Sequence, residues 1–174
     1  MKLYSYSHCL YCARVKYVAG KLGIKLDDVV LDYDDTETPT KLIGKKMVPI
    51  LEKDGSFAPL LQIGLPRWPL LDLKEFKTES SRIAGEDNKQ STELNFVNLI
   101  ASTSEIVLQV NEFLIGTEKQ LNINNGKTSL SLLDSAIYFS ILRGLYCEPT
   151  ITWPEQLNQW MNYQALESHV PLLR

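Results

Sequence analysis

Cysteine is scarce in this chain of 174 residues, which contains only three. A small, odd number of cysteines cannot form a structural disulfide framework, and it suits a reducing compartment in which a cysteine pair is catalytic. Long apolar runs are also absent: no stretch reaches the roughly eighteen residues of a membrane span, and no apolar leader precedes the first predicted strand. These absences predict a cytoplasmic protein that has no membrane partner.

Charge of one sign is not concentrated anywhere along the chain. The 18 lysines and arginines and the 21 acidic residues are interspersed, and the formal net charge is -3. Because nucleic acids and anionic membranes bind basic patches, we expect no nucleic-acid partner. A Ser/His/Asp constellation, a phosphate-binding loop and internal repeats are missing too. The chain is long enough for one sizeable domain or two small ones.

A pair of cysteines, Cys9 and Cys12, directly follows the predicted strand 2–6 in the motif Cys-Leu-Tyr-Cys. A helix that begins at this point directs unpaired N–H groups and its positive dipole end toward Cys9. We therefore expect the pKa of the Cys9 thiol to fall below the ~8.5 of a free thiol. Cys12, one helical turn later and more buried, would then resolve the mixed disulfide that Cys9 forms.

Three interpretations of this pair compete: unrelated buried cysteines, a metal site and dithiol redox chemistry. A zinc or iron–sulfur site needs about four soft ligands, but the rest of the chain offers only Cys147, His8 and His169. Unrelated cysteines would not explain their placement at a strand-to-helix turn. Redox chemistry is therefore favoured and no metal is expected. Cys147 is predicted to be a small buried hydrophobe, and His8 a bystander.

The first third of the chain predicts alternating strands and helices. The expected order is a helix over 11–22, a strand over 25–31, a helix with Thr38 as its N-cap that ends at Gly44, a strand over 47–51 and a hairpin at Asp54-Gly55. Proline in a strand is unusual, since it cannot donate to the ladder, and it suggests an edge, a bulge or a cis bond. A cis bond between Val48 and Pro49 would turn the backbone of Val48 toward an extended, peptide-like ligand.

The second half of the chain predicts helices. Apolar residues follow helical spacing from Leu94 to about Gly116, including Val97, Ile100, Val107, Leu108 and Leu114. Ser131 and Asp134 form a capping box at the start of a helix in which Leu133, Ile137, Ile141 and Leu145 recur, and we expect that helix to be fully packed. A last helix turns Leu157, Trp160 and Met161 to the core.

Taken together, Cys9-Leu10-Tyr11-Cys12, Val48-Pro49-Ile50-Leu51 and Asp54-Gly55 resemble a glutaredoxin domain. The start of the chain and the run Glu37-Thr38-Pro39-Thr40 resemble the two-domain bacterial glutaredoxin 2 type. The resemblance implies an α/β thioredoxin-like domain with a mixed sheet over residues 1–59. A linker or adapted segment would follow over 60–76, and an all-α domain like that of glutathione transferases over 77–174. Both domains would be shortened.

The same resemblance implies the roles of individual residues. Cys9 would be the nucleophile and Cys12 the resolving thiol. Tyr11 would flank glutathione, and Val48 would bind its backbone beside a cis Pro49. The implied function is that of a glutathione-dependent thiol–disulfide oxidoreductase, with glutathione as cosubstrate and disulfide-containing proteins as partners. The alternatives are a non-catalytic binding or dimerisation module derived from a glutaredoxin and, less favoured, a glutathione transferase.

Two departures from the family pattern affect these expectations. Leu10 stands where the family usually has proline, which predicts a shifted redox potential. After Pro59 the chain lacks the Glu-Ser pair and the helix that receive the γ-glutamyl carboxylate of glutathione, so we infer that a few dozen residues of the pattern are absent. One face of the sheet would then need cover from residues 60–76 or, in a homodimer, from a second copy.

Overall fold

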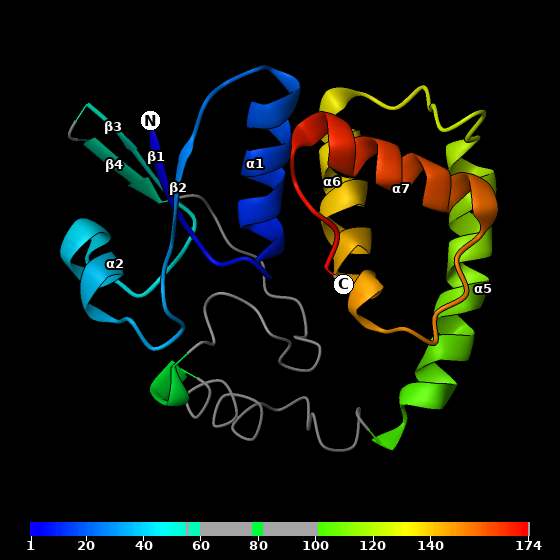
Figure 1. Cartoon of the computed structure of the whole chain (residues 1–174), viewed down its shortest axis with the longest axis horizontal. Helices are drawn as coiled ribbons and strands as arrows, with labels where there is room; N and C mark the ends of the chain where they lie inside the picture. The colour runs from blue at the N-terminus through cyan, green and yellow to red at the C-terminus, as the bar shows by residue number, and fades with distance from the viewer. Residues whose placement is uncertain (55, 60–77, 82–100, 174) are drawn as a thin grey trace.

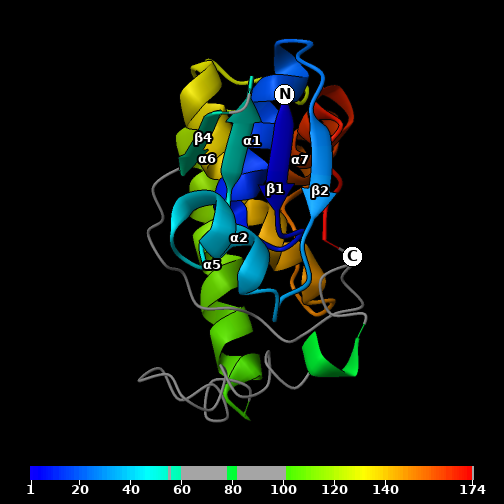
Figure 2. The same ribbon diagram turned by 90° about the vertical axis from the view of Figure 1, so that its left-hand side faces the viewer.

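The computed structural model describes residues 1–54, 56–59, 78–81 and 101–173. Its N-terminal part contains β1 (Lys2–Ser5), α1 (Leu10–Lys21), β2 (Asp27–Val30), α2 (Glu37–Ile43), β3 (Ile50–Lys53) and β4 (Ser56–Pro59). The strands form one sheet in the order β2-β1-β3-β4. β1 pairs in parallel with β2, and the other two pairings are antiparallel. This mixed sheet, with α2 in front of it and α1 behind it in Figure 2, confirms the predicted thioredoxin-like domain.

The local sequence explains most boundaries of these elements. Gly44 ends α2 at a φ of 78°, a left-handed conformation that glycine adopts without strain. The hairpin between β3 and β4 turns at Asp54, with Lys53 opposite Ser56. The prediction of Thr38 as N-cap was wrong: α2 begins two residues earlier, after Thr36, and the Thr38 N–H donates to the Asp35 carboxylate at 2.8 Å.

The proline of the third predicted strand lies outside the strand. β3 begins at Ile50, so the predicted range 47–51 started too early. Pro49 has no N–H group to donate to a ladder, and it directly precedes the strand. The peptide bond between Val48 and Pro49 is cis, as the sequence suggested.

The C-terminal part is helical. It contains α5 (Thr103–Leu121), α6 (Leu132–Leu142), the 3-10 helix η2 (Arg143–Cys147) and α7 (Glu155–Ser168). Figure 1 shows α1 between the sheet and the pair α6 and α7, with α5 on the far side of that pair. The thioredoxin-like part therefore joins the helical part through α1, the helix that follows Cys9.

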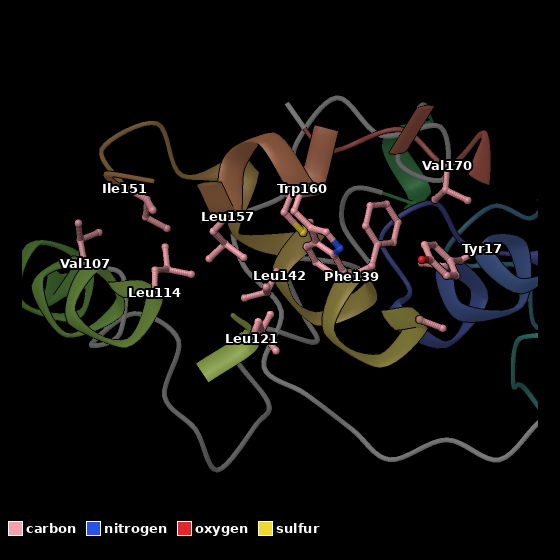
Figure 3. Packing of buried hydrophobic residues seen from close by; sticks show 13 residues of the cluster. Tyr17, Val107, Leu114, Leu121, Phe139, Leu142, Ile151, Leu157, Trp160 and Val170 are labelled. Atoms are coloured by element: carbon pink, nitrogen blue, oxygen red, sulfur yellow. The ribbon is translucent and has the colours of Figure 1, made fainter. Parts of the chain in front are cut away.

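One hydrophobic core extends across this junction. Figure 3 shows the side chains of α5, α6 and α7 in a continuous row that reaches Tyr17 of α1. The buried members are Ala13, Tyr17, Val107, Leu114, Leu121, Ala136, Phe139, Leu142, Ile151, Leu157, Trp160, Met161 and Val170. A second cluster of Tyr6, Cys12, Leu31, Tyr33 and Val48 lies within the thioredoxin-like part. α1 thus contributes one face to each cluster.

The predicted inner faces of α5 and α6 were partly wrong. α6 buries Ala136, Phe139 and Leu142, whereas the expected inward residues Leu133, Ile137 and Ile141 are exposed by 67%, 43% and 40%. The helix is therefore not fully packed in the described structure. In α5, Val107 and Leu114 are buried as predicted, but Leu108 is exposed. The four-residue spacing predicted that the face with these apolar side chains would be buried, but packing against α1 and α7 buries a different face.

Several expectations lie outside the described residues. They concern the adapted segment 60–76, the first part of the helix predicted from Leu94 and the surface on which a homodimer would form. In the part of the chain that is described, none of the helices is both long and apolar enough for a membrane crossing.

Candidate active site around Cys9

The turn between β1 and α1 places Cys9 at the start of the helix. The Cys9 N–H donates to the carbonyl oxygen of Tyr6 at 3.3 Å, which closes a four-residue turn. Cys9 is then the N-cap of α1, and its sulfur accepts the backbone N–H of Cys12 at 3.5 Å. The first turn of α1 carries no acidic residue. A negative charge on this sulfur is therefore stabilised by a helix N-terminus without repulsion from a carboxylate there.

Cys12 lies one helical turn behind Cys9 and is completely buried. Burial raises the pKa of the Cys12 thiol well above its ordinary value, and the hydrogen bond and charge of Cys9 act in the same direction. Cys9 is only half-buried, and no disulfide joins it to Cys12. The two sulfurs thus differ in access: reagents reach Cys9 first, and Cys12 remains a protonated thiol.

Val48 and Pro49 belong to the same site. Both are buried, and Val48 lies in the cluster that contains Cys12 and partly buried Cys9. The structure therefore brings Cys9, Cys12 and the cis bond before Pro49 together, although they are some forty residues apart in the sequence. Their use as a binding site for glutathione stays a prediction.

Tyr11 is linked to the helical part of the molecule through Arg14. The guanidinium carbon of Arg14 lies 4.9 Å from the centroid of the Tyr11 ring, and Nε of Arg14 donates to the hydroxyl of Ser140 in α6 at 2.8 Å. A guanidinium over an aromatic face is an attractive arrangement. The predicted site residue Tyr11 is therefore held through Arg14, which the sequence did not single out.

Comparison with known proteins assigns the chain to a family. Residues 54–174, more than half of the sequence, match the family described as "Glutaredoxin 2, C terminal domain". The chain belongs to the glutaredoxin 2 family. It is 29% identical to glutaredoxin 2 of Escherichia coli strain K12 over 99% of this chain and 98% of that protein, and the same values hold for glutaredoxin 2 of Escherichia coli O157:H7.

A solved glutaredoxin 2 structure shares the fold. The protein from Salmonella typhimurium, in complex with glutathione, superimposes with a TM-score of 0.84 at 24% sequence identity and covers 99% of this chain and 96% of that one. This likeness shows a thioredoxin-like domain followed by a helical domain like that of glutathione transferases.

The comparison with glutaredoxin 2 also bears on the length of the chain. The alignment with the Escherichia coli protein spans 213 positions, so at least 39, the difference between 213 and the 174 residues here, have no counterpart. The inference that a few dozen residues of the glutaredoxin 2 pattern are absent agrees with this difference.

A further residue at the site, Arg143, was not among the predicted site residues. It is 4% exposed, and its Nη1 donates to the carbonyl oxygen of Ser7 at 2.9 Å. Ser7 lies in the turn that precedes Cys9. A single arginine inside the apolar run Ile141-Leu142-Arg143-Gly144-Leu145 is the sequence signal that could have indicated a buried, bound cation.

The other residues considered as metal ligands make different contacts. Cys147 donates its S–H to the carbonyl oxygen of Gly144 at 2.8 Å, and burial raises its pKa to about 11. His8 stacks on Tyr6 at 5.6 Å between ring centroids, and His169 ends α7. Among the described residues, no group of three or more histidine, cysteine and acidic side chains is placed to hold a metal ion.

Proposed function

We propose that this protein is a glutathione-dependent thiol–disulfide oxidoreductase that reduces protein disulfides and glutathione mixed disulfides. The observation that carries the proposal is the position of the Cys9 sulfur, which is half-buried, caps α1 and accepts the N–H of Cys12. A thiolate is the attacking species in disulfide exchange, and this environment favours the thiolate. Membership of the glutaredoxin 2 family supports the same chemistry.

The first step forms one disulfide and breaks another. The Cys9 thiolate attacks one sulfur of a protein disulfide, a mixed disulfide forms, and the second substrate sulfur leaves as a thiolate. With a glutathione mixed disulfide as substrate, the protein thiol leaves and Cys9 keeps the glutathionyl group. One further glutathione thiolate then releases oxidised glutathione and restores Cys9.

The second step of the two-thiol route uses Cys12. Its thiolate attacks the Cys9 sulfur, the substrate leaves as a thiol, and a disulfide between Cys9 and Cys12 forms. Two glutathione molecules then reduce this disulfide and are oxidised to glutathione disulfide. Burial raises the pKa of Cys12, and hydrogen bonding and charge from Cys9 raise it further. A Cys9 sulfur in a mixed disulfide carries no charge, so Cys12 ionises more readily at the moment when it must attack.

We place glutathione beside Tyr11, Val48 and Pro49. Val48 and Pro49 adjoin the cysteine pair in the buried cluster, and the Tyr11 ring is fixed by Arg14. An extended peptide gains main-chain hydrogen bonds from the backbone of a binding site, which is the role proposed for the backbone of Val48. The Salmonella typhimurium structure of the same fold is a glutathione complex, which supports this choice of cosubstrate.

Disulfide-containing proteins are the proposed partners, and the reducing cytoplasm is the proposed compartment because free catalytic thiols persist there. The expectation of a homodimer depends on surfaces outside the described residues and stays a prediction.

Replacement of the nucleophile tests this function. We expect Cys9→Ser to reduce turnover of a glutathionylated peptide to background, because a serine hydroxyl is not ionised near neutral pH. Cys147→Ser is the matched control, since that thiol is hydrogen-bonded to Gly144 and has a raised pKa. It should retain wild-type turnover. The assay couples the oxidised glutathione that is produced to its enzymatic reduction and follows the reductant.

Two results would contradict the proposal. Turnover of Cys9→Ser near the wild-type rate would remove Cys9 from the mechanism. Slow alkylation of wild-type Cys9 at about pH 6, together with no turnover, would favour the non-catalytic binding module instead. A conjugation activity that survives in Cys9→Ser would favour a glutathione transferase.

A further inference from the structure

In the turn that carries Cys9, one carbonyl group needs a hydrogen-bond donor from another part of the chain. Its own hydrogen bond joins the Cys9 N–H to Tyr6, so the carbonyl of Ser7, the second residue of the turn, takes no part in it. A backbone carbonyl in a packed region needs a partner, because an unsatisfied buried polar group costs free energy. Here the partner comes from the helical part of the molecule.

Arg143, the first residue of η2, supplies that partner. Its Nη1 donates to the Ser7 carbonyl at 2.9 Å, and its Nε donates to the Pro171 carbonyl at 2.5 Å. The guanidinium thus connects the Cys9 turn, the end of α6 and the C-terminal segment after α7. The planar fork of arginine suits this task, since separate nitrogens reach the two carbonyl oxygens.

We propose that Arg143 is a positioning residue for Cys9: its guanidinium binds the Ser7 carbonyl, fixes the turn and so holds the Cys9 sulfur at the start of α1. The inference rests on the proposed role of Cys9. It gives the helical part of the chain a direct function in the redox site, beyond its packing against α1.

Two physical effects follow from this contact. The bond to Ser7 restricts the turn, which keeps the Cys9 sulfur in line with the N–H of Cys12. The guanidinium also binds the residue two positions before Cys9 in the sequence, and a positive charge near a thiol favours the thiolate. The reactivity of Cys9 at low pH should therefore depend on Arg143.

Other ionisable groups surround the turn and must stay unchanged in a test. His8 and Tyr6 belong to the turn itself, and Tyr33 and Cys12 lie in the same buried cluster. Lys16 of α1 acts on Cys12. All five are retained in the variants below, so a change in the reactivity of Cys9 reports on Arg143.

The experiment measures the alkylation rate of Cys9 by iodoacetamide from about pH 5 to about pH 9, with mass spectrometry of the Cys9 peptide, and the hydrogen exchange of the Cys9 amide. We expect Arg143→Met to lower the rate at about pH 6 by roughly threefold to tenfold and to move the profile to higher pH. Arg143→Lys keeps the charge and should restore most of the rate. Lysine has one side-chain nitrogen where arginine has several, so it holds the turn less firmly. The Cys9 amide should therefore exchange faster than in the wild type.

Tyr17→Phe is the control. It removes a different contact between α1 and the helical part, the 2.5 Å hydrogen bond from the Tyr17 hydroxyl to Gln164, and it leaves the Cys9 turn untouched. Its profile and amide exchange should match the wild type. An equal shift in Tyr17→Phe would overturn the proposal, since general loosening of the junction would then explain the effect.

Folded Arg143→Met with wild-type alkylation and exchange would overturn the proposal as well. If Arg143→Met does not fold, Arg143→Lys decides: faster exchange of the Cys9 amide supports the proposal, and unchanged exchange contradicts it. These readouts do not require turnover. Dependence on Arg143 in a chain that reduces no glutathionylated substrate would therefore refute the proposed function and leave this inference standing.

Discussion

At the scale of single residues, Cys9 and Cys12 are the same chemical group in two environments. Cys9 is half-buried at a helix N-terminus and accepts an N–H, whereas Cys12 is fully buried and its pKa is raised. Burial disfavours the charged form of a thiol, and a helix start favours it. This difference supports the proposal that Cys9 attacks and Cys12 resolves.

Replacement of the buried thiol separates the two routes of reduction. Cys12→Ser should keep the one-thiol reaction with a glutathione mixed disulfide within a few-fold of the wild type, because that route uses Cys9 alone. Reduction of a protein disulfide by the two-thiol route should fall by about tenfold or more, since no thiol remains to resolve the mixed disulfide. Both rates are measured by coupled assay, and the trapped mixed disulfide by mass spectrometry. Retained two-thiol reduction would indicate that Cys147 resolves.

At the scale of elements, the helices α5 and α6 of the C-terminal part begin differently. Ser131 caps α6: its hydroxyl accepts the Asp134 N–H at 3.1 Å and donates to the Asp134 carboxylate at 2.7 Å. Ser102 stands at the same position before α5 but makes no side-chain capping bond. The sequence predicted the first cap from the spacing of serine and acid, and the structure confirms it.

These two serines form a matched pair for a stability test. Ser131→Ala should lower the free energy of unfolding by about 1 kcal/mol, because an orphan N–H at the start of α6 loses its acceptor. Ser102→Ala should change it by less than about 0.5 kcal/mol. Urea denaturation followed by circular dichroism measures both. Equal effects of the two substitutions would mean that the capping bond does not stabilise α6.

At the scale of the whole molecule, α1 joins the thioredoxin-like part to the helical part. Its Ala13 and Tyr17 lie in the large core with α5, α6 and α7, and its Cys12 lies in the cluster within the thioredoxin-like part. The approach is closest at Gly20, where an added Cβ would lie 2.0 Å from the carbonyl oxygen of Ser168 in α7. Only glycine allows the two backbones to pack at this distance.

Replacement of Gly20 by a larger residue tests how closely α1 and α7 pack. Gly20→Ala should lower the free energy of unfolding by about 1–3 kcal/mol, because α1 and α7 must move apart. Gly116→Ala is the control: it lies within α5 with no atom near its added Cβ, and it should stabilise by up to about 1 kcal/mol through helix propensity. Urea denaturation compares them. A stabilised Gly20→Ala would show that the two helices do not pack this closely in solution.

The sequence predicted those features that arise from neighbours along the chain. The order of strands and helices, the Gly44 and Ser131 caps, the Asp54 turn and the place of Cys9 before a helix are all local, and the structure bears them out. Boundaries were less accurate at two places. Thr38 was expected to cap α2, but its N–H donates to Asp35 and it lies inside the helix. The apolar residues before Pro49 resemble a strand although proline cannot donate to the ladder.

By itself, then, the sequence determined where the two thiols lie, because the spacing of Cys9 and Cys12 after the first strand places them at a strand-to-helix turn. Only the tertiary structure decided what surrounds them. Arg143 meets Ser7 across 136 positions of sequence, and α6 buries Phe139 while Ile137 stays exposed. Such contacts depend on how α1 packs against α6 and α7, and periodicity fixes the faces of a helix without choosing the partner of each face.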